Sequence, residues 1–551
     1  MKKEIGSKPG TSYRHDYCRI FRKITKVNNS IEEGLVMETV TFCTDVLVIG
    51  GGVAGLCAAL EAKDNGSEVT ILAKTKVGRG GNTLMTRNGM AAVMEEGFDW
   101  DSTVSHAEDT MKGGLQINDK KLVETMTSHG PEAISRLIEL GVPFLKEEDQ
   151  LYRKGSPGHS HKRFLTVDGS SIKSPWIQGI ALMGPLLEKA SEIGINVIDN
   201  IAITELLKDK EGQVVGARGL DLKNNKAQLI SSKAVIIASG GAGRLYAKNT
   251  NAADATGDGY ALASLAGAQI RDMEFMQFHP AVVIEGGRIV MSTSIFADGA
   301  VLRNSEGKAF MKDYSDQGDM ATRDVMAQAV FREIQAGRGT ELDGVQLDLT
   351  RIPKEVMQSK YKPLYDFLKG REHIQVAPSA HFTMGGIVID EKGQTTVPGL
   401  FAAGEAAGGV HGANRLAGNA LTEAAVFGFI AGKEAASFAS ATTALSSDPA
   451  EHEANFSFNE SANGQELDFK ELRQDLIKLM NDCVGIIRTT EGLNNTQQSL
   501  QQYYHQVREY NPKDFNNLIE QKQLLLMLET AKLITEASLK RTESLGAHYR
   551  T

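Results

Sequence analysis

The feature that most constrains the fold is a strand–glycine–helix segment, VLVIGGGVAGLCAAL, in the first tenth of the chain. Val46–Ile49 is a continuous apolar run, typical of a strand buried in a parallel sheet. Gly50, Gly52 and Gly55 follow with the spacing G-x-G-x-x-G, and Val69–Leu72 is a second apolar run. These runs predict a βαβ unit. Its glycines allow a tight turn and bring the pyrophosphate of a dinucleotide up to the N-terminus of the helix.

The end of the second predicted strand departs from the pattern of NAD-binding proteins. Those proteins commonly carry a carboxylate there, which binds the ribose. Ala73 and Lys74 stand at this point instead. The unit therefore predicts a bound dinucleotide but gives no support for NAD.

Two further strand–glycine signals occur much later, KAVIIASGGAGRLY at 233–246 and VPGLFAAGEAAGG at 397–409. Three such signals predict one nucleotide-binding domain interrupted by an insertion. The predicted divisions are a poorly ordered extension (1–42), the first part of the nucleotide-binding domain (43–271), an inserted domain (272–381), the second part (382–440), a linker (441–470) and a helical C-terminal domain (471–551).

Composition excludes several classes of protein. The net charge of −9 and a pI near 5.8 argue against a general nucleic-acid binder. The four cysteines are scattered without a CxxC pair, so we expect no metal site and no iron–sulfur cluster held by this chain. So few cysteines suit a reducing, cytoplasmic setting. With neither a signal peptide nor 18 consecutive apolar residues, we expect membrane attachment only through a partner.

Longer motifs resemble a known family. They are ASGGAGRLY (238–246), ATGDGYALASLAGAQIRDMEFMQFHP (255–280), TRDVMAQA (322–329), AHFTMGG (380–386), AAGEAAGGVHGANRLAGNAL (402–421) and RTESLGAHYR (541–550). The chain is similar to the flavoprotein subunits of succinate dehydrogenase and fumarate reductase, and to L-aspartate oxidase. The resemblance implies an α/β fold: a Rossmann-like two-part FAD-binding domain, an inserted α+β capping domain and a C-terminal helical domain.

The resemblance also implies which residues hold the FAD. They are Gly50, Gly52, Ala54, Gly55, Lys74, Asn82, Thr83, Gly89, Ala202, Ala238, Gly240, Asp258, Glu405, Arg415, Ala420 and Leu421. The helix that starts near Asn419 would direct its positive end at the flavin and favour the anionic reduced form. Family members that bind FAD covalently carry a histidine at the position of Asn82. We therefore predict non-covalent FAD.

Three residues are expected around a small dicarboxylate by the same resemblance: His279, His381 and Arg415. Two imidazoles and a guanidinium can bind carboxylates through charge-assisted hydrogen bonds and polarise an adjoining C=C bond for hydride transfer from flavin N5. Arg323 in TRDVMAQA matches the family's proton donor and acceptor. Because arginine is a poor acid, Arg323 can serve only if it is held beside the substrate carbon. The alternative for Arg323 is an ion pair with Asp324 or a neighbouring residue.

One stretch departs from the family. There a segment T-E-x-x-R-G-E-G follows QFHP, and its Glu and Arg relay protons to the catalytic arginine. In this chain Ser292 stands at the Thr position, Thr293 at the Glu position and Phe296 at the Arg position. Ser292 and Thr293 keep hydroxyl contacts to substrate, but neither Thr293 nor Phe296 can relay a proton. Three explanations of this departure remain open. Protons reach Arg323 by water or another residue, or the substrate is a related acid, or the chain is a flavin electron carrier that has lost catalysis.

The sequence thus predicts an FAD-dependent oxidoreductase that transfers a hydride between flavin N5 and the α,β-carbons of a small carboxylic acid, most simply fumarate and succinate. L-aspartate oxidase is one alternative, because Asn82 and the segment GHSHKRF, with His159 and His161, resemble the pattern of that enzyme. A flavin electron-relay subunit is the other alternative. Since the chain carries no cluster ligands, we expect a separate iron–sulfur subunit or a diffusible electron acceptor, and a position in the cytoplasm or at the inner face of the membrane through partners.

Overall fold

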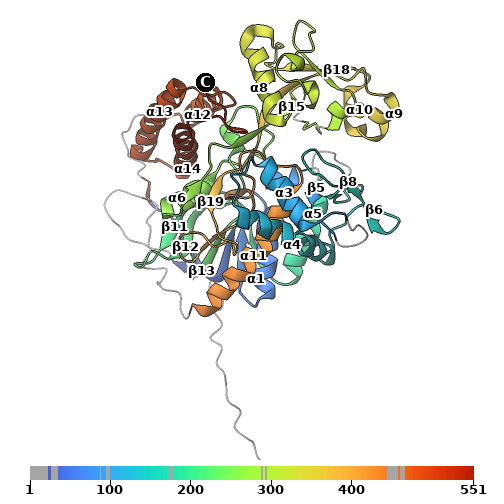
Figure 1. The fold of residues 1–551 in the computed structure, drawn as a ribbon. Helices are drawn as coiled ribbons and strands as arrows, with labels where there is room; N and C mark the ends of the chain where they lie inside the picture. Colours follow the sequence, from blue (N-terminus) through green and yellow to red (C-terminus); the bar gives the residue numbers. More distant parts are fainter. Residues whose placement is uncertain are drawn as a thin grey trace, which may run out of the picture.

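The computed structural model describes residues 23–25, 35–86, 89–94, 100–172, 178–286, 289–291, 294–442, 457–458 and 466–551. Most of the predicted extension and of the predicted linker lies outside these described residues. Three bodies are visible in Figure 1: a large α/β body, a smaller body that contains β15, β18 and α8, and a group of helices near the C-terminus.

The α/β body is built on an eight-stranded sheet with the order β10-β4-β3-β13-β12-β11, in which β1 also pairs with β3 and β20 with β13. Its strands are β1 (Lys23–Thr25), β3 (Thr39–Ile49), β4 (Val69–Leu72), β10 (Asn196–Ile198), β11 (Ile201–Lys208), β12 (Val214–Asp221), β13 (Lys226–Ile237) and β20 (Leu400–Ala402). The strands β3, β4, β13 and β20 run parallel, so the three strand–glycine signals end at one edge of the sheet. This arrangement confirms the predicted fold class.

Two glycines explain why the first strand, turn and helix fit together. Gly50 has a φ of +123°, and a Cβ there would lie 2.2 Å from the carbonyl oxygen of Ala238. A Cβ on Gly55 would lie 1.9 Å from the carbonyl oxygen of Gly50. Both contacts are too short for any side chain, so the close packing of turn on sheet requires glycine at these positions.

Helices cover the sheet on both sides. The helices α1 (Val53–Asp64) and α11 (Asn419–Ala441) pack against each other along their lengths through small residues, because a Cβ on Gly428 or Gly432 would collide with the α1 backbone. The remaining elements of this body are α2 (Gly81–Leu84), α3 (Thr103–Gly113), α4 (Lys120–Glu139), α5 (Ile180–Glu192), α6 (Asp258–Ala266), β2 (Leu35–Val36), β5 (Gly89–Ala91), β6 (Lys146–Glu147), β7 (Gln150–Leu151), β8 (Arg153–Lys154), β9 (Phe164–Thr166), β14 (Ile270–Arg271), β19 (Gly386–Val388), β21 (Ala407–Gly408) and β22 (Ser457–Phe458).

The inserted body has its own sheet and core. Its antiparallel strands have the order β15-β18-β17-β16, and its buried apolar residues form a cluster separate from that of the large sheet. The elements are β15 (Met276–Val283), β16 (Val301–Arg303), β17 (Val345–Asp348), β18 (His373–Thr383), α7 (Ser294–Ala297), α8 (Arg323–Glu333), α9 (Lys354–Ser359) and α10 (Lys362–Leu368). The neighbouring strands β15 and β18 run from the α/β body into this cap (Figure 1).

The C-terminal helices α12 (Phe469–Cys483), α13 (Thr490–Glu509) and α14 (Phe515–Lys540) pack together, and α14 also contacts α6. Arg488, whose side chain is fully buried, fixes this group to the rest of the chain. It donates to the carbonyl oxygen of Glu274 at 2.7 Å and to Ser538 Oγ at 3.1 Å, and its Nη1 lies 2.7 Å from His548 Nδ1. The helical group is therefore attached next to the strand that leads into the cap.

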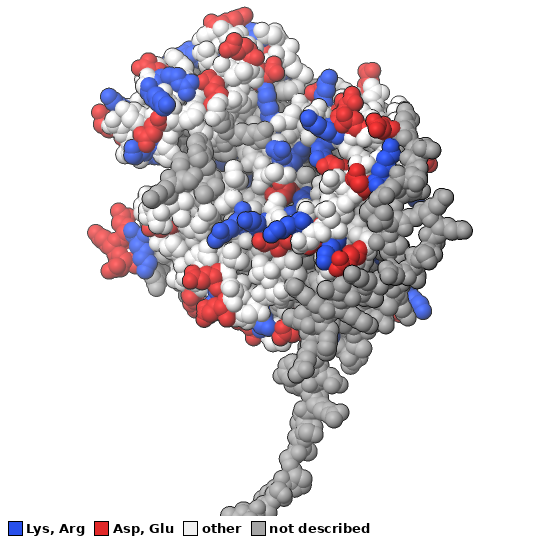
Figure 2. All heavy atoms as spheres, turned by 180° about the vertical axis from the view of Figure 1, so that it is seen from behind, with Lys and Arg blue, Asp and Glu red and all other residues white. Residues whose placement is uncertain are grey.

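No helix in the described ranges is long and apolar enough to cross a membrane. Lys and Arg are interspersed with Asp and Glu over the face drawn in Figure 2. This mixed surface agrees with the slightly acidic composition.

Candidate active site

The residues predicted to hold the pyrophosphate lie where β3, β13 and β20 end. Ala54 faces Gly404, because a Cβ on Gly404 would lie 2.9 Å from the Ala54 Cβ. Thr83 Oγ1 accepts a hydrogen bond from Val53 N at 3.3 Å, which joins the glycine turn to α2. Gly240 has a φ of +78° and open space where a side chain would stand. Such an open, glycine-lined edge at a helix N-terminus suits a pyrophosphate.

A second group of predicted cofactor residues meets beside the glycine turn. Lys74 Nζ donates to Asp258 Oδ2 at 2.7 Å and to Thr256 Oγ1 at 2.5 Å. Ala202 lies in β11, whose first residue donates its backbone N–H to the carbonyl oxygen of Ala73. The structure therefore brings Lys74, Asp258 and Ala202 together, although nearly 200 residues separate the first two in the sequence.

Asn82, which stands where covalent members carry histidine, is held entirely by protein groups. Its Nδ2 donates to Asn251 Oδ1 at 2.6 Å and to Glu405 Oε2 at 2.9 Å, and its Oδ1 accepts from Ala252 N at 3.0 Å. Burial raises the pKa of Glu405 to about 7, against the hydrogen bonds from Thr383 N and Asn82 that favour the charged form. Asn82 therefore fixes a carboxyl group that can change its charge near neutral pH.

The last predicted cofactor residues have different surroundings. A Cβ on Gly89 would overlap the ring of Phe164, so this glycine has a packing reason independent of any cofactor. Ala420 and Leu421 lie in the first turn of α11, directly after Asn419. Ala238 directly follows β13 and lies against Gly50. The structure thus gives Gly89 and Ala238 packing contacts, and the binding of FAD by this set stays a prediction.

Two histidines and two arginines from separate elements converge between the α/β body and the cap. The rings of His279 in β15 and His381 in β18 have centroids 5.5 Å apart. The guanidinium of Arg415 lies over the ring of Phe382, with Cζ 4.6 Å from its centroid. Arg323, the first residue of α8, is close enough that its charge acts on both His381 and Arg415. The four predicted substrate and catalytic side chains thus form one site.

The site carries two buried guanidiniums, and the charges of Glu405 and Glu423 act on that of Arg415 without a direct ion pair among the described residues. Burial, with the charges of Arg415 and Arg323, lowers the pKa of His381 well below its ordinary value, so this imidazole is neutral at pH 7. Burial lowers the pKa of Arg415 to about 9 and that of Arg323 to about 10. Within the described residues neither guanidinium forms an ion pair, and Arg415 Nε is buried without a hydrogen-bond partner. An anion would compensate both charges.

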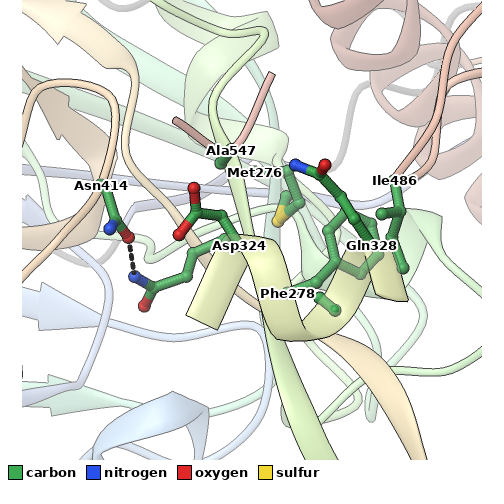
Figure 3. A pocket seen from close by; sticks show the side chains of 9 residues that line it. Met276, Phe278, Asp324, Gln328, Asn414, Ile486 and Ala547 are labelled. Atoms are coloured by element: carbon green, nitrogen blue, oxygen red, sulfur yellow. Dashed lines mark hydrogen bonds between the residues drawn. The ribbon is translucent and has the colours of Figure 1, made fainter. Parts of the chain in front are cut away.

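Several side chains that sequence reasoning missed hold these groups in place. Gln277 Oε1 accepts from Arg415 Nη2 at 3.0 Å, and Gln277 Nε2 donates to the Arg415 carbonyl oxygen and to Asn414 Oδ1, the bond drawn in Figure 3. Thr250 Oγ1 lies 2.8 Å from His381 Nδ1. Gln277 lies two residues before His279 in QFHP, so its place in the motif was the available signal. Thr250 had no such signal.

Within the described residues, no side chain is seen to take the place of the family's proton relay at Arg323. Ser292 and Thr293 lie outside the described residues. Phe296 is buried in the apolar cluster of the cap and carries no group that could move a proton. In the described part of the chain Asp324 makes no ion pair with Arg323, and its Oδ1 is buried without a partner. Asp324 instead lines a pocket beside the Gln277–Asn414 pair (Figure 3).

The two histidines of GHSHKRF have different positions. His159 Nε2 lies 2.8 Å from the carbonyl oxygen of Ala417, in the same loop as Arg415. The ring of His161 lies 5.2 Å from that of Trp100. His159 is therefore beside the candidate site, and no contact of His161 with a predicted site residue is found among the described residues.

Comparisons with known proteins agree with this geometry. Residues 45–421 match a family model described as FAD binding domain, and residues 473–551 match one described as fumarate reductase flavoprotein C-term. A fumarate reductase (CoM/CoB) subunit of Methanothermobacter marburgensis is 37% identical over 93% of this chain and 95% of that relative. An L-aspartate oxidase of Caulobacter vibrioides is 36% identical over 92% of both chains. The structure of Mycobacterium smegmatis Sdh1 in complex with UQ1 superposes with a TM-score of 0.81, at 32% identity, over 93% of this chain and 89% of the other.

Proposed function

The chain belongs to the FAD-dependent oxidoreductases of the fumarate reductase and succinate dehydrogenase flavoprotein family, and we propose that it exchanges a hydride with the α and β carbons of a small carboxylic acid. The simplest pair of acids is fumarate and succinate. The observation that carries this proposal is the convergence of His279, His381, Arg323 and Arg415 on one site, where neither guanidinium forms an ion pair with a described carboxylate.

When bound, FAD supplies the hydride donor and acceptor at its N5 atom. The residues that would hold it are the glycine turn, Lys74 with Asp258, and the first turn of α11. Because Asn82 is held by Asn251 and Glu405 and has no nucleophilic group, we infer non-covalent attachment.

The acid would be positioned by the chain's own cations and imidazoles. Gln277 and the ring of Phe382 fix the orientation of the Arg415 side chain. Arg415 can therefore bind one carboxylate without a change in its side-chain conformation. The imidazoles of His279 and His381 would donate hydrogen bonds to carboxylate oxygens. Charge drawn toward Arg415 polarises the adjoining double bond, and Arg323, with its lowered pKa, would deliver or take the proton at the neighbouring carbon.

Electrons must leave or enter through another molecule. The described residues contain no group of three or more His, Cys, Asp or Glu side chains placed to hold a metal ion. The relative in Methanothermobacter marburgensis is named as one subunit of its enzyme, which supports assembly with a partner. We infer a separate iron–sulfur electron-transfer subunit, with the chain in the cytoplasm and any membrane contact made through partners.

L-aspartate oxidation is the second candidate, favoured by Asn82 in place of the covalent histidine and by the 36% identity to an L-aspartate oxidase. It needs a group for the substrate's ammonium. Thr293 and Phe296 supply no carboxylate at the two departing positions of the family segment.

Anaerobic flavin spectroscopy separates these functions. We expect the purified protein to carry FAD, and its chemically reduced flavin to be reoxidised by fumarate or a substituted analogue. Bleaching of the oxidised flavin by L-aspartate, with recovery in oxygen, would assign aspartate oxidase instead. A flavin that responds to none of these acids, in protein that co-purifies with an iron–sulfur partner, would assign an electron-relay function.

A further inference from the structure

The loop Arg415–Asn419 connects the two halves of the candidate site. Arg415 at its start belongs to the candidate acid site, and Asn419 at its end is the first residue of α11. Two histidines, the buried His106 and the partly buried His159, contact this loop. His159 Nε2 lies 2.8 Å from the carbonyl oxygen of Ala417, and His106 Nε2 lies 2.9 Å from Asn419 Oδ1.

The hydrogen-bond partners of His106 and His159 show which ring nitrogen of each histidine carries the proton. Asn419 Nδ2 donates to Thr110 Oγ1 at 2.9 Å, and the Thr110 hydroxyl donates to the carbonyl oxygen of His106 at 2.8 Å. The amide nitrogen of Asn419 therefore faces Thr110, and its oxygen accepts a hydrogen bond from the N–H at His106 Nε2. The Ala417 carbonyl oxygen can only accept, so His159 also donates from Nε2.

Both rings are held in the neutral form. Burial lowers the pKa of His106 to about 4 and also lowers that of His159. His106 Nδ1 is buried with no partner in the described part of the chain, so a second proton there would be unsatisfied. His159 Nδ1 lies 3.4 Å from Arg163 Nη1, which can only donate.

The support behind the two histidines is itself rigid. The Arg163 side chain is fully buried and donates to Asp101 at 2.6 Å, to Asp109 at 2.5 Å and to Ser105 at 2.9 Å. All three partners lie in α3 or at its start, and α3 also carries His106. This cluster therefore fixes α3 and the His159 segment relative to each other.

We propose that His106 and His159 are positioning residues whose hydrogen bonds fix the loop Arg415–Asn419. The position of this loop sets both the midpoint potential of the flavin and the affinity for the acid. The inference about acid affinity rests on the proposed function; the inference about the flavin rests only on FAD binding. The positive end of α11 stabilises negative charge on the reduced cofactor only if the N-terminus of the helix lies close to the flavin. Loss of the His106 bond would let Asn419 and Arg415 shift together.

His106→Leu and His106→Gln test the proposal, with His129→Gln at an exposed position of α4 as the control. Leucine removes the donor, whereas the glutamine amide can still donate to Asn419 Oδ1. Because a buried hydrogen bond is lost, we expect His106→Leu to bind FAD at least ~10-fold more weakly and to have a more negative midpoint potential. We also expect a raised KM for the acid with a smaller change in kcat. His106→Gln should restore all three quantities.

Thr110→Val gives a second route if His106→Leu does not fold. It removes the hydroxyl that orients Asn419 and should shift the potential in the same direction by less. Wild-type FAD affinity and potential in His106→Leu, or in Thr110→Val where the former does not fold, would overturn the proposal. FAD affinity and potential are measured without any acid, so they remain decisive even if the wild-type protein turns over no carboxylic acid.

Discussion

At the scale of single residues, the site combines two arginines that form no ion pair with a described carboxylate and an imidazole, that of His381, kept neutral by burial. Phe382 and Gln277 hold the Arg415 side chain, whereas no described side chain pairs with Arg323. We therefore assign different roles to the two guanidiniums: Arg415 binds, and Arg323 is available for proton transfer.

Replacing Arg323 by Gln should remove proton transfer and leave acid binding nearly intact. We expect kcat to fall by at least ~10²-fold, the usual range for loss of a general acid. The spectral change of the oxidised flavin on adding the acid should keep a similar half-saturation concentration. Arg508→Gln, an exposed change in α13, is the control. A loss of acid binding as large as the loss in kcat would contradict the division of roles.

The buried neutral histidines predict an acid-labile fold. Between pH 6.5, the ordinary pKa, and about 4, the folded-state pKa of His106, the unfolded chain binds a proton that the folded chain does not. The free energy of unfolding therefore falls as pH falls through this window, by about 3 kcal/mol for His106 alone. Urea unfolding at pH 7 and pH 4.5 should show a smaller pH effect in His106→Gln than in wild type. Equal pH effects would contradict this.

At the scale of elements, the dinucleotide turn depends on contacts that leave no room for Cβ atoms. Gly55→Ala should separate α1 from the turn, because its Cβ would lie 1.9 Å from the Gly50 carbonyl oxygen. We expect a loss of FAD binding greater than ~10-fold and destabilisation by about 1–3 kcal/mol, as for overpacking in a core. Fluorescence titration with FAD and thermal unfolding measure both. Gly155→Ala, where a Cβ meets open space, should change neither; unchanged FAD affinity in Gly55→Ala would refute the argument.

At the scale of the whole molecule, the candidate site lies where the α/β body meets the cap, and the helical group is attached at the same junction. Gln277 links cap and loop, and Arg488 links the helical group to Glu274 at the start of β15. The arrangement explains why the motifs are spread over the chain. Each body contributes a short stretch to one junction.

Arg488→Met should loosen the helical group from this junction. It leaves the Glu274 carbonyl oxygen, Ser538 and His548 without their shared donor. We expect destabilisation by about 2–4 kcal/mol and faster hydrogen exchange within 469–551. Arg473→Gln breaks only the partly exposed pair with Glu520 and should cost less than about 1 kcal/mol. Equal effects of the two changes would contradict the role of Arg488.

Sequence reasoning reached the fold class and the FAD cofactor, which the structure and the comparisons confirm. It did so because the βαβ turn and the longer motifs are local patterns. The supports of the site are not local: Thr250 lies 131 positions from His381, and His106 lies 313 positions from Asn419. A single histidine or threonine in a helix or loop carries no signal for a partner so far away, so such contacts require the folded chain. The roles of the substrate residues remain predictions.

The central claim is that an acid binds beside FAD through Arg415 and the imidazoles of His279 and His381. The most direct measurement is the absorbance difference spectrum of the FAD-loaded protein during titration with fumarate, succinate and substituted analogues, for wild type and Arg415→Met. The account predicts a saturable change for at least one acid in wild type and none in Arg415→Met with FAD still bound. No change with any acid in wild type, or the same change in both proteins, would contradict it.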